Sequence, residues 1–176
     1  MESAIDKTRA NGGGTICLDI GEYVLKAPLV IGNVRSLRIV GKGSGTVLRS
    51  QRGPGVMRIE ENANDIVLSA FAMGKGEGGS GDPILAVSDA SRVGLDRLTF
   101  ESLRGDVAAV ALGNRVEGLW MRDCMATTPV GVTTLERGAQ MRGICIEGNT
   151  LRCVNGAIVF EAGQSRYEGG NRVGAN

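Results

Sequence analysis

The chain has 176 residues, a formal net charge of +1 and 42% hydrophobic residues, which is enough for one globular domain with its own core. The near-neutral charge argues against a nucleic-acid partner, because such a partner needs a strong basic excess on one face. No apolar run reaches 18 residues, so no membrane span is expected, and the N-terminus shows no signal peptide.

Glycine supplies 28 residues, roughly twice its usual share of about 7%. Aromatic residues make up only 3% of the chain, so we predict a core of small and branched aliphatic side chains. The chain has no histidine, and its four cysteines form no CxxC motif. Reduced, packed thiols are therefore favoured over a zinc site, and we expect neither a metal nor a cofactor.

At the N-terminus, residues 3–10 are predicted to form a short helix. Ser3 would be its N-cap, and Asp6, three residues later, takes the second position of a capping box. Ala4 and Ile5 would then cover the first coil of the structure that follows.

Two families of short apolar alternations recur along the rest of the chain, at steps of about 25 residues. Alternation of this kind is the signal of a β-strand. No helical pattern separates the strands, so each must stack on its predecessor as in a solenoid. The first family is Leu37-x-Ile39, Ile66-x-Leu68, Val93-x-Leu95, Leu119-x-Met121 and Ile144-x-Ile146. The second is Leu29-x-Ile31, Met57-x-Ile59, Leu85-x-Val87, Ala108-x-Val110, Thr133-x-Leu135 and Ile158-x-Phe160.

The stacking predicts two inward columns of side chains. One consists of Ile39, Leu68, Leu95, Met121 and Ile146, and the other of Phe71, Leu98, Cys124 and Asn149. We expect Asn149 to cap a turn with its amide, because an unpaired buried amide would cost about 1–3 kcal/mol. The predicted fold class is all-β: a single-stranded right-handed parallel β-helix of about six coils with a short N-terminal capping helix.

We predict a single domain over residues 1–176. Residues 1–14 form the N-terminal cap, residues 15–165 the coils, and residues 166–176 an incomplete, truncated last coil. Nothing in that last segment resembles a cap. An open end exposes apolar side chains and unpaired backbone, so we expect a partner domain or self-association to cover it.

Three segments carry a resemblance to a known family. Residues 13–25 have a glycine pair, a strand and Gly-x-Tyr; residues 36–48 have a strand, a Gly-x-Gly turn and another strand; and residues 144–151 have an Asn after the strand. Each is similar to a coil of the pectate-lyase-like (pectin-lyase-like) β-helix superfamily. The resemblance implies the fold, and it favours an extracellular, cell-envelope or phage-particle location. It leaves activity open, because the superfamily includes lyases, hydrolases, epimerases, phage tail proteins and non-catalytic modules.

The best candidate site lies on the outer face of the first strand family. Asp96, Arg122 and Glu147 take equivalent outward positions on three successive coils, with Arg97 and Asp123 one position further on. Strands stack about 4.8 Å apart, so these side chains should touch. They would form either a charged groove for a uronate-like sugar or an alternating ladder of mutually paired charges.

Trp120, the only tryptophan, should point outward between Gly94 on the preceding coil and Cys145 on the following one. It would either stack on a sugar ring or pack laterally under a loop.

We expect a non-catalytic β-helix module that contacts a glycan or protein, or has a structural role, within a larger extracellular or phage-like protein. Its expected ligand is a polysaccharide, bound through Asp96, Trp120, Asp123 and Glu147. The alternative is a polysaccharide lyase that cleaves uronate polymers by β-elimination, with Arg97 or Arg122 as the base. Only that alternative requires Ca²⁺. The absence of histidine and of paired carboxylates favours the first interpretation.

Overall fold

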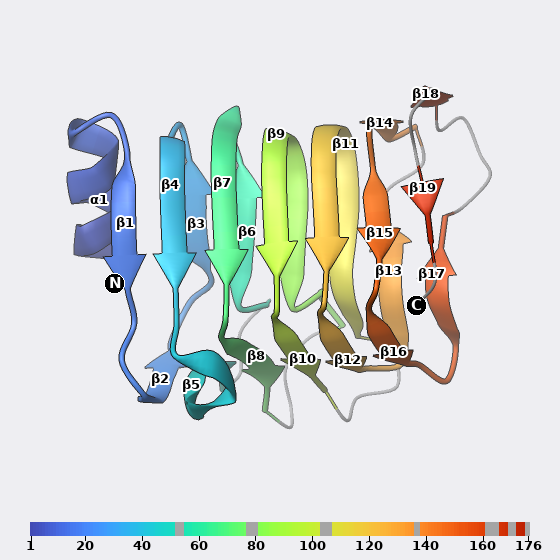
Figure 1. Ribbon diagram of the computed structural model, residues 1–176, viewed down its shortest axis with the longest axis horizontal. Helices are drawn as coiled ribbons and strands as arrows, with labels where there is room; N and C mark the ends of the chain where they lie inside the picture. The colour runs from blue at the N-terminus through green and yellow to red at the C-terminus, as the bar shows by residue number, and fades with distance from the viewer. Residues whose placement is uncertain are drawn as a thin grey trace.

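The computed structural model of the chain is a right-handed parallel β-solenoid preceded by one short helix (Figure 1). It describes residues 1–51, 55–76, 81–102, 107–135, 138–160, 166–168 and 172–174. All strand pairs in these ranges are parallel, and each joins segments one coil apart. The predicted all-β, right-handed parallel β-helix with an N-terminal helix is therefore confirmed.

Each coil contributes strands to three faces, which we number in chain order as first, second and third. The solenoid has about five turns, against the predicted six coils, and its second face is a separate six-stranded sheet. Its strands are β2 (Gly21–Leu25), β5 (Thr46–Ser50), β8 (Ala72–Lys75), β10 (Thr99–Glu101), β12 (Met125–Thr127) and β16 (Thr150–Arg152).

The first and third faces belong to one continuous sheet, because two long strands bend around the corner between them. These are β9 (Leu85–Asp96) and β11 (Ala108–Arg122), whose first halves lie on the third face and whose second halves lie on the first. The other strands of the first face are β1 (Gly14–Cys17), β4 (Arg35–Val40), β7 (Ala63–Ser69), β15 (Cys145–Glu147) and β19 (Arg172–Val173). The other strands of the third face are β3 (Leu29–Gly32), β6 (Met57–Glu60), β13 (Val130–Thr134) and β17 (Gly156–Val159). The corner also holds β14 (Gln140–Arg142) and β18 (Arg166–Glu168), and the 3₁₀ helix η1 (Gly43–Gly45) precedes β5.

The predicted inward column of the first face is confirmed. Strand registers align Ile39, Leu68, Leu95, Met121 and Ile146 on consecutive coils, and all five side chains are fully buried. The same register adds Ile16 at the N-terminal end of the column. Stacking like on like in this way buries aliphatic surface continuously along the solenoid axis.

The second predicted column, at the turn after the first face, is also confirmed. Phe71, Leu98, Cys124 and Asn149 are all buried. Asn149 accepts a hydrogen bond from the backbone N–H of Cys124 at 2.9 Å and donates to the carbonyl oxygens of Met121 and Glu147, each at 3.1 Å. It is the turn-capping amide that the sequence predicts.

On the third face, the predicted alignment is right for the early coils and wrong for two later ones. Leu29, Met57 and Leu85 align as expected, but Leu85 then pairs with Val110 instead of Ala108. In the next coil Val110 pairs with Val132, so Thr134 points inward and Leu135 is 45% exposed. The predicted Thr133-x-Leu135 pair is off by one residue, which exchanges the inner and outer faces of a strand.

The N-terminal helix α1 (Glu2–Ala10) caps the first coil, as predicted. Ile5 is 2% exposed and Ala4 is packed against the core. The predicted N-cap is wrong: the helix begins one residue earlier, with Met1 as N-cap and no side-chain capping bond. Ser3 therefore lies inside the first turn, where its backbone is already helical and its side chain cannot cap.

At the other end, β18 pairs with β14 and β19 with β15, so the stacking extends beyond residue 165. Residues 161–165, 169–171 and 175–176 lie outside the described residues. The predicted end of the coils at residue 165, the incomplete last coil and its covering by a partner stay predictions.

Candidate functional site

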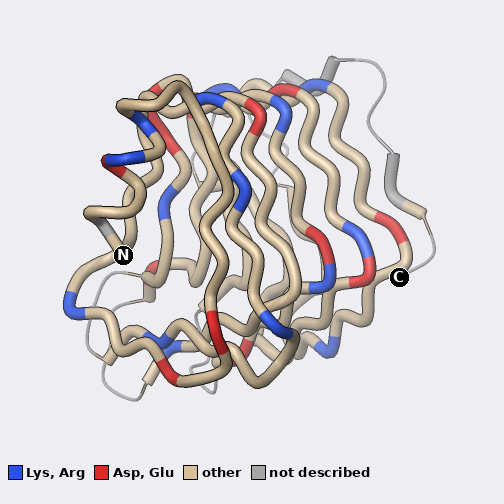
Figure 2. Tube along the Cα trace, turned by 60° about the vertical axis from the view of Figure 1, so that its left-hand side comes forward, with Lys and Arg blue, Asp and Glu red and all other residues tan. Residues whose placement is uncertain are grey.

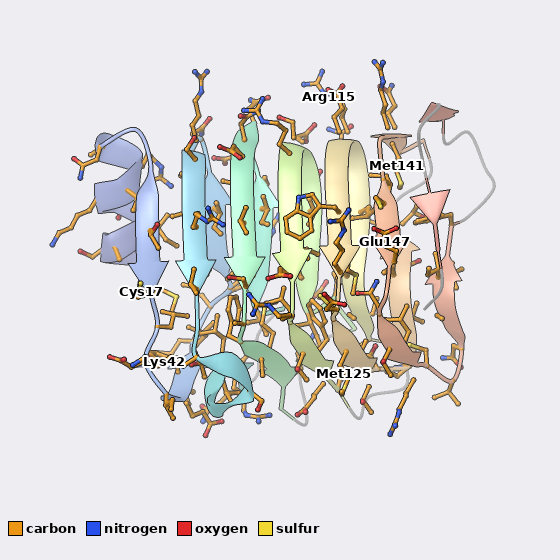
Figure 3. All side chains as sticks on the ribbon, viewed as in Figure 1. Cys17, Lys42, Arg115, Met125, Met141 and Glu147 are labelled. Carbon is orange, nitrogen blue, oxygen red and sulfur yellow. The ribbon has the colours of Figure 1, made fainter. Side chains whose placement is uncertain are left out.

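The residues predicted to form a site do share the first face. Arg122 pairs in register with Asp96 on one side and Glu147 on the other. Its guanidinium lies 3.1 Å from the Glu147 carboxylate. Figure 3 shows Glu147 on the outer surface of β15. Asp96, Arg122 and Glu147 therefore form a ladder of alternating charge, one of the two arrangements predicted from the sequence. At least one ion pair in this ladder joins neighbouring coils.

Arg97 and Asp123 occupy the turn that follows the first face. Both have left-handed backbone conformations, with φ of 48° and 51°. Arg97 binds the carboxylate of its own neighbour Asp96 at 2.9 Å, and Asp123 is exposed. The left-handed turn thus moves these two residues out of the row formed by Arg122 and Glu147.

Trp120 points outward between Gly94 and Cys145, as predicted. Its ring lies over the preceding coil, where a Cβ added to Gly94 would fall 2.2 Å from the indole Cζ2. The Arg122 guanidinium carbon lies 5.8 Å from the ring centroid, within the range of a cation–π contact. The indole is half-buried and packs on its own sheet instead of under a loop.

The first face is consequently a self-paired surface. The guanidinium of Arg122 already contacts one carboxylate and one aromatic ring, and that of Arg97 contacts a second carboxylate. Arg122 separates the carboxylates of Asp96 and Glu147, so the ladder does not gather the several carboxylates that Ca²⁺ requires. The favoured role of this face is structural.

Two hollows of the described surface lie elsewhere, around the third face and its corner with the first. A hollow of about 730 Å³, the third-face groove, opens over β6 and the first half of β9. It is lined by Arg58, Ile59, Glu60, Glu61, Asn62, Ala86, Ser88, Asp89 and Leu135. A second hollow of about 440 Å³, the corner groove, lies where the third face bends into the first. It is lined by Arg35, Ser36, Asn62, Asn64, Asp89, Ala90, Ser91, Arg92, Arg115 and Glu117.

The two grooves are adjacent, and Asn62 and Asp89 line both of them. Both residues have left-handed backbone conformations, with φ of 60° and 46°; Asn62 lies in a turn and Asp89 within β9. In the sequence their segments indicate only turns, since Asn and Asp are common there. The signal that could have revealed the grooves is the recurrence of polar turn residues at the same place on successive coils.

Hydrogen bonds between coils fix the walls of these grooves. Asn114 donates its amide to both carboxylate oxygens of Asp89, at 2.6 and 2.7 Å. Asn33 donates to the Glu61 carboxylate at 3.0 Å. Within β6 on the third face, Arg58 forms an ion pair with Glu60 at 2.8 Å. These contacts hold polar groups in place before any ligand arrives, which lowers the entropic cost of binding.

The four cysteines are free, and they differ in exposure. Burial raises the pKa of the Cys124 thiol to about 12, and burial also raises the pKa of Cys153. Cys17 is exposed, contrary to the expectation that every thiol is packed.

Among the residues that the structure describes, no three His, Cys, Asp or Glu side chains gather closely enough to hold a metal ion. Within the same ranges, no helix has the length and apolar character needed to cross a membrane.

The chain has no match among models of known protein families, among curated proteins or among solved structures. The assignment of the fold as a parallel β-solenoid therefore depends on the strand pairing and its register alone. Membership of the pectate-lyase-like superfamily stays a prediction from the three similar segments, and function must be inferred from the surface.

Proposed function

We propose that the chain is a non-catalytic β-helix module, of pectate-lyase-like type, that binds a glycan chain along the third-face and corner grooves. The observation that supports this is that the two hollows lie side by side and share Asn62 and Asp89 in their linings. We further propose that the module belongs to a larger extracellular, cell-envelope or phage-particle assembly, as the family resemblance implies.

The shape of the third-face groove suits a linear polymer. Its lining residues run from Ile59 on β6 to Leu135, just after β13. These strands are three coil steps apart, which is about 14 Å at a strand spacing of about 4.8 Å. An extended chain can lie along the solenoid axis and meet the same face of several coils.

The chemistry of the groove suits sugar hydroxyl groups. Amide, hydroxyl, carboxylate and guanidinium groups line it, and Leu135 and Ala86 supply apolar surface among them. A hydroxyl group both donates and accepts hydrogen bonds, so mixed donors and acceptors on a preformed wall match it. Ligand sites commonly combine apolar surface with a few fixed polar groups in this way.

A binding role is favoured over a lyase by the state of the two candidate bases. Arg122 and Arg97 each contact a carboxylate, and a charged guanidinium has no lone pair with which to accept a proton. Neither residue lines the grooves.

Affinity electrophoresis through gels containing a panel of neutral and acidic polysaccharides tests the proposal. The groove variant is Arg58→Ala, and its matched control is Arg49→Ala on the second face. Both arginines pair with a glutamate, Arg58 with Glu60 at 2.8 Å and Arg49 with Glu22 at 2.5 Å. We expect retardation of the native chain by at least one polymer. We expect Arg58→Ala to weaken binding by about tenfold or more, equivalent to one lost charge-assisted hydrogen bond, and Arg49→Ala to leave it unchanged.

Three outcomes would contradict the proposal. The first is no retardation by any polymer, and the second is an equal loss in both variants. The third is a rise in ultraviolet absorbance from unsaturated sugar products when uronate polymers are incubated with the chain, with or without Ca²⁺. That result would support the polysaccharide lyase instead.

A further inference from the structure

The corner groove brings together three arginines from three coils. Arg35 begins β4, Arg92 lies in β9 and Arg115 lies in β11, and all three line the same 440 Å³ hollow. Figure 3 shows the Arg115 side chain extending from the edge of the coils, and Figure 2 shows basic and acidic positions following one another along that upper edge. The solenoid stacks these positions although they are far apart in the sequence.

Two of these guanidinium groups have no partner among the residues that the structure describes. In these ranges the guanidinium groups of Arg35 and Arg115 form neither a hydrogen bond nor an ion pair, whereas that of Arg92 donates to the Asn64 side-chain oxygen. This differs from Arg58, Arg97 and Arg122, each of which contacts a carboxylate. Guanidinium donors that line a common hollow and are not bound to a described carboxylate suit an anionic ligand.

The acidic residues of the groove do not neutralise these arginines. Asp89 accepts both hydrogen bonds from the neutral Asn114 amide. Within the described part of the chain, neither Asp89 nor Glu117 forms an ion pair with Arg35, Arg92 or Arg115. The lining therefore carries three positive and two negative side chains, and none of the three arginines forms an ion pair with a described carboxylate.

We propose that the corner groove is a binding site for a tetrahedral oxyanion, the sulfate or phosphate ester of a ligand. One guanidinium fork satisfies a planar carboxylate with two parallel bonds. Three guanidinium groups on different coils offer more donors than two carboxylate oxygens can align with, and a tetrahedral group presents oxygens in several directions. The Asn62 amide and the Ser91 hydroxyl line the same hollow and supply neutral donors.

This inference deepens the proposed function, because it names the substituent that a glycan in the adjacent grooves would carry. It depends on the proposed function only for the identity of that carrier. Binding of free inorganic sulfate tests it separately, so failure of the oxyanion site and failure of glycan binding are distinguishable.

Isothermal titration calorimetry of the whole chain with sodium sulfate, at constant ionic strength in sodium chloride, is the direct test. The groove variant is the double substitution Arg35→Gln and Arg115→Gln. The control is Arg38→Gln, an exposed arginine on β4 that lies outside the groove lining. We expect saturable sulfate binding by the native chain, a loss of about tenfold or more in the double variant, and an unchanged affinity in the control. Circular dichroism of each variant confirms that the solenoid is intact.

Absence of saturable heat from sulfate in the native chain would overturn the proposal even if the double variant fails to fold. Equal affinity in the folded double variant and the native chain would overturn it as well. Titration with glucose 6-sulfate and glucose 6-phosphate then identifies which ester is preferred. Glucuronate is the comparison for a planar carboxylate, and binding of glucuronate as tight as that of both esters would contradict a tetrahedral site.

Discussion

The indole ring of Trp120 occupies the space in which a side chain on Gly94 would stand. The two residues face each other in register on adjacent strands, and a Cβ on Gly94 would lie 2.2, 2.5 and 3.0 Å from three ring atoms. The glycine lets the only tryptophan lie over the sheet, and the ring in turn buries that glycine.

Gly94→Val should therefore displace the ring. Although valine favours strands, overpacking at this contact should lower the free energy of unfolding by about 1–3 kcal/mol. Urea denaturation measures the loss, and tryptophan emission should shift to the red as the ring becomes solvated. In a Trp120→Ala background the same Gly94→Val change should cost little. An equal cost in both backgrounds would show that the ring is not the cause.

Asn149→Ala should destabilise the solenoid by about 2–4 kcal/mol, because it leaves the Cys124 N–H and two carbonyl groups without their amide partner. Asn114→Ala is the matched control. Its amide is exposed and bonds the Asp89 carboxylate, so its loss should cost less than about 1 kcal/mol. Chemical denaturation of both variants gives the comparison, and similar losses would refute the capping role of Asn149.

Leu95→Ala should cost about 2–5 kcal/mol in the free energy of unfolding, because Leu95 lies at the centre of the aliphatic column with no exposed surface. Val30→Ala, on a strand position that is 39% exposed, should change stability by no more than about 0.5 kcal/mol. Urea unfolding of the two variants measures this difference. A small effect of Leu95→Ala would mean that the aliphatic column contributes little to the stability of the fold.

Stability should decline above pH 9 through Cys124. Burial raises its pKa from 9.0 to about 12, so the unfolded chain loses the thiol proton before the folded chain does. The folded state then binds more protons, and its stability falls as the pH rises from 9 towards 12. Between pH 8 and pH 10 this amounts to about 1.4 kcal/mol. The difference in unfolding free energy between the native chain and Cys124→Ala should shrink by that amount, and a difference that does not vary with pH would exclude the mechanism.

The β-helix was predictable because its information is local and repeated. Apolar residues two apart, recurring about every 25 residues, predict both the strands and the order in which they stack. The columns through Leu95 and through Asn149 follow from that spacing, and both are confirmed. Prediction failed where the spacing is irregular. The third-face strands of later coils shift against the earlier ones, and alternation alone does not distinguish Thr134 from Leu135 as the inward residue.

The sequence also brought Asp96, Trp120, Arg122 and Glu147 to one face, but it did not show whether their charges are free or paired. Only the tertiary structure decides this, because pairing depends on where long side chains extend across neighbouring strands. For the same reason the grooves around Asn62 and Asp89 have no signal within any one segment. They arise where turns from different coils lie side by side. The sequence by itself determined the winding of the backbone, since that depends on periodic burial. The tertiary structure decided the binding surface, since it depends on contacts between residues a full coil apart.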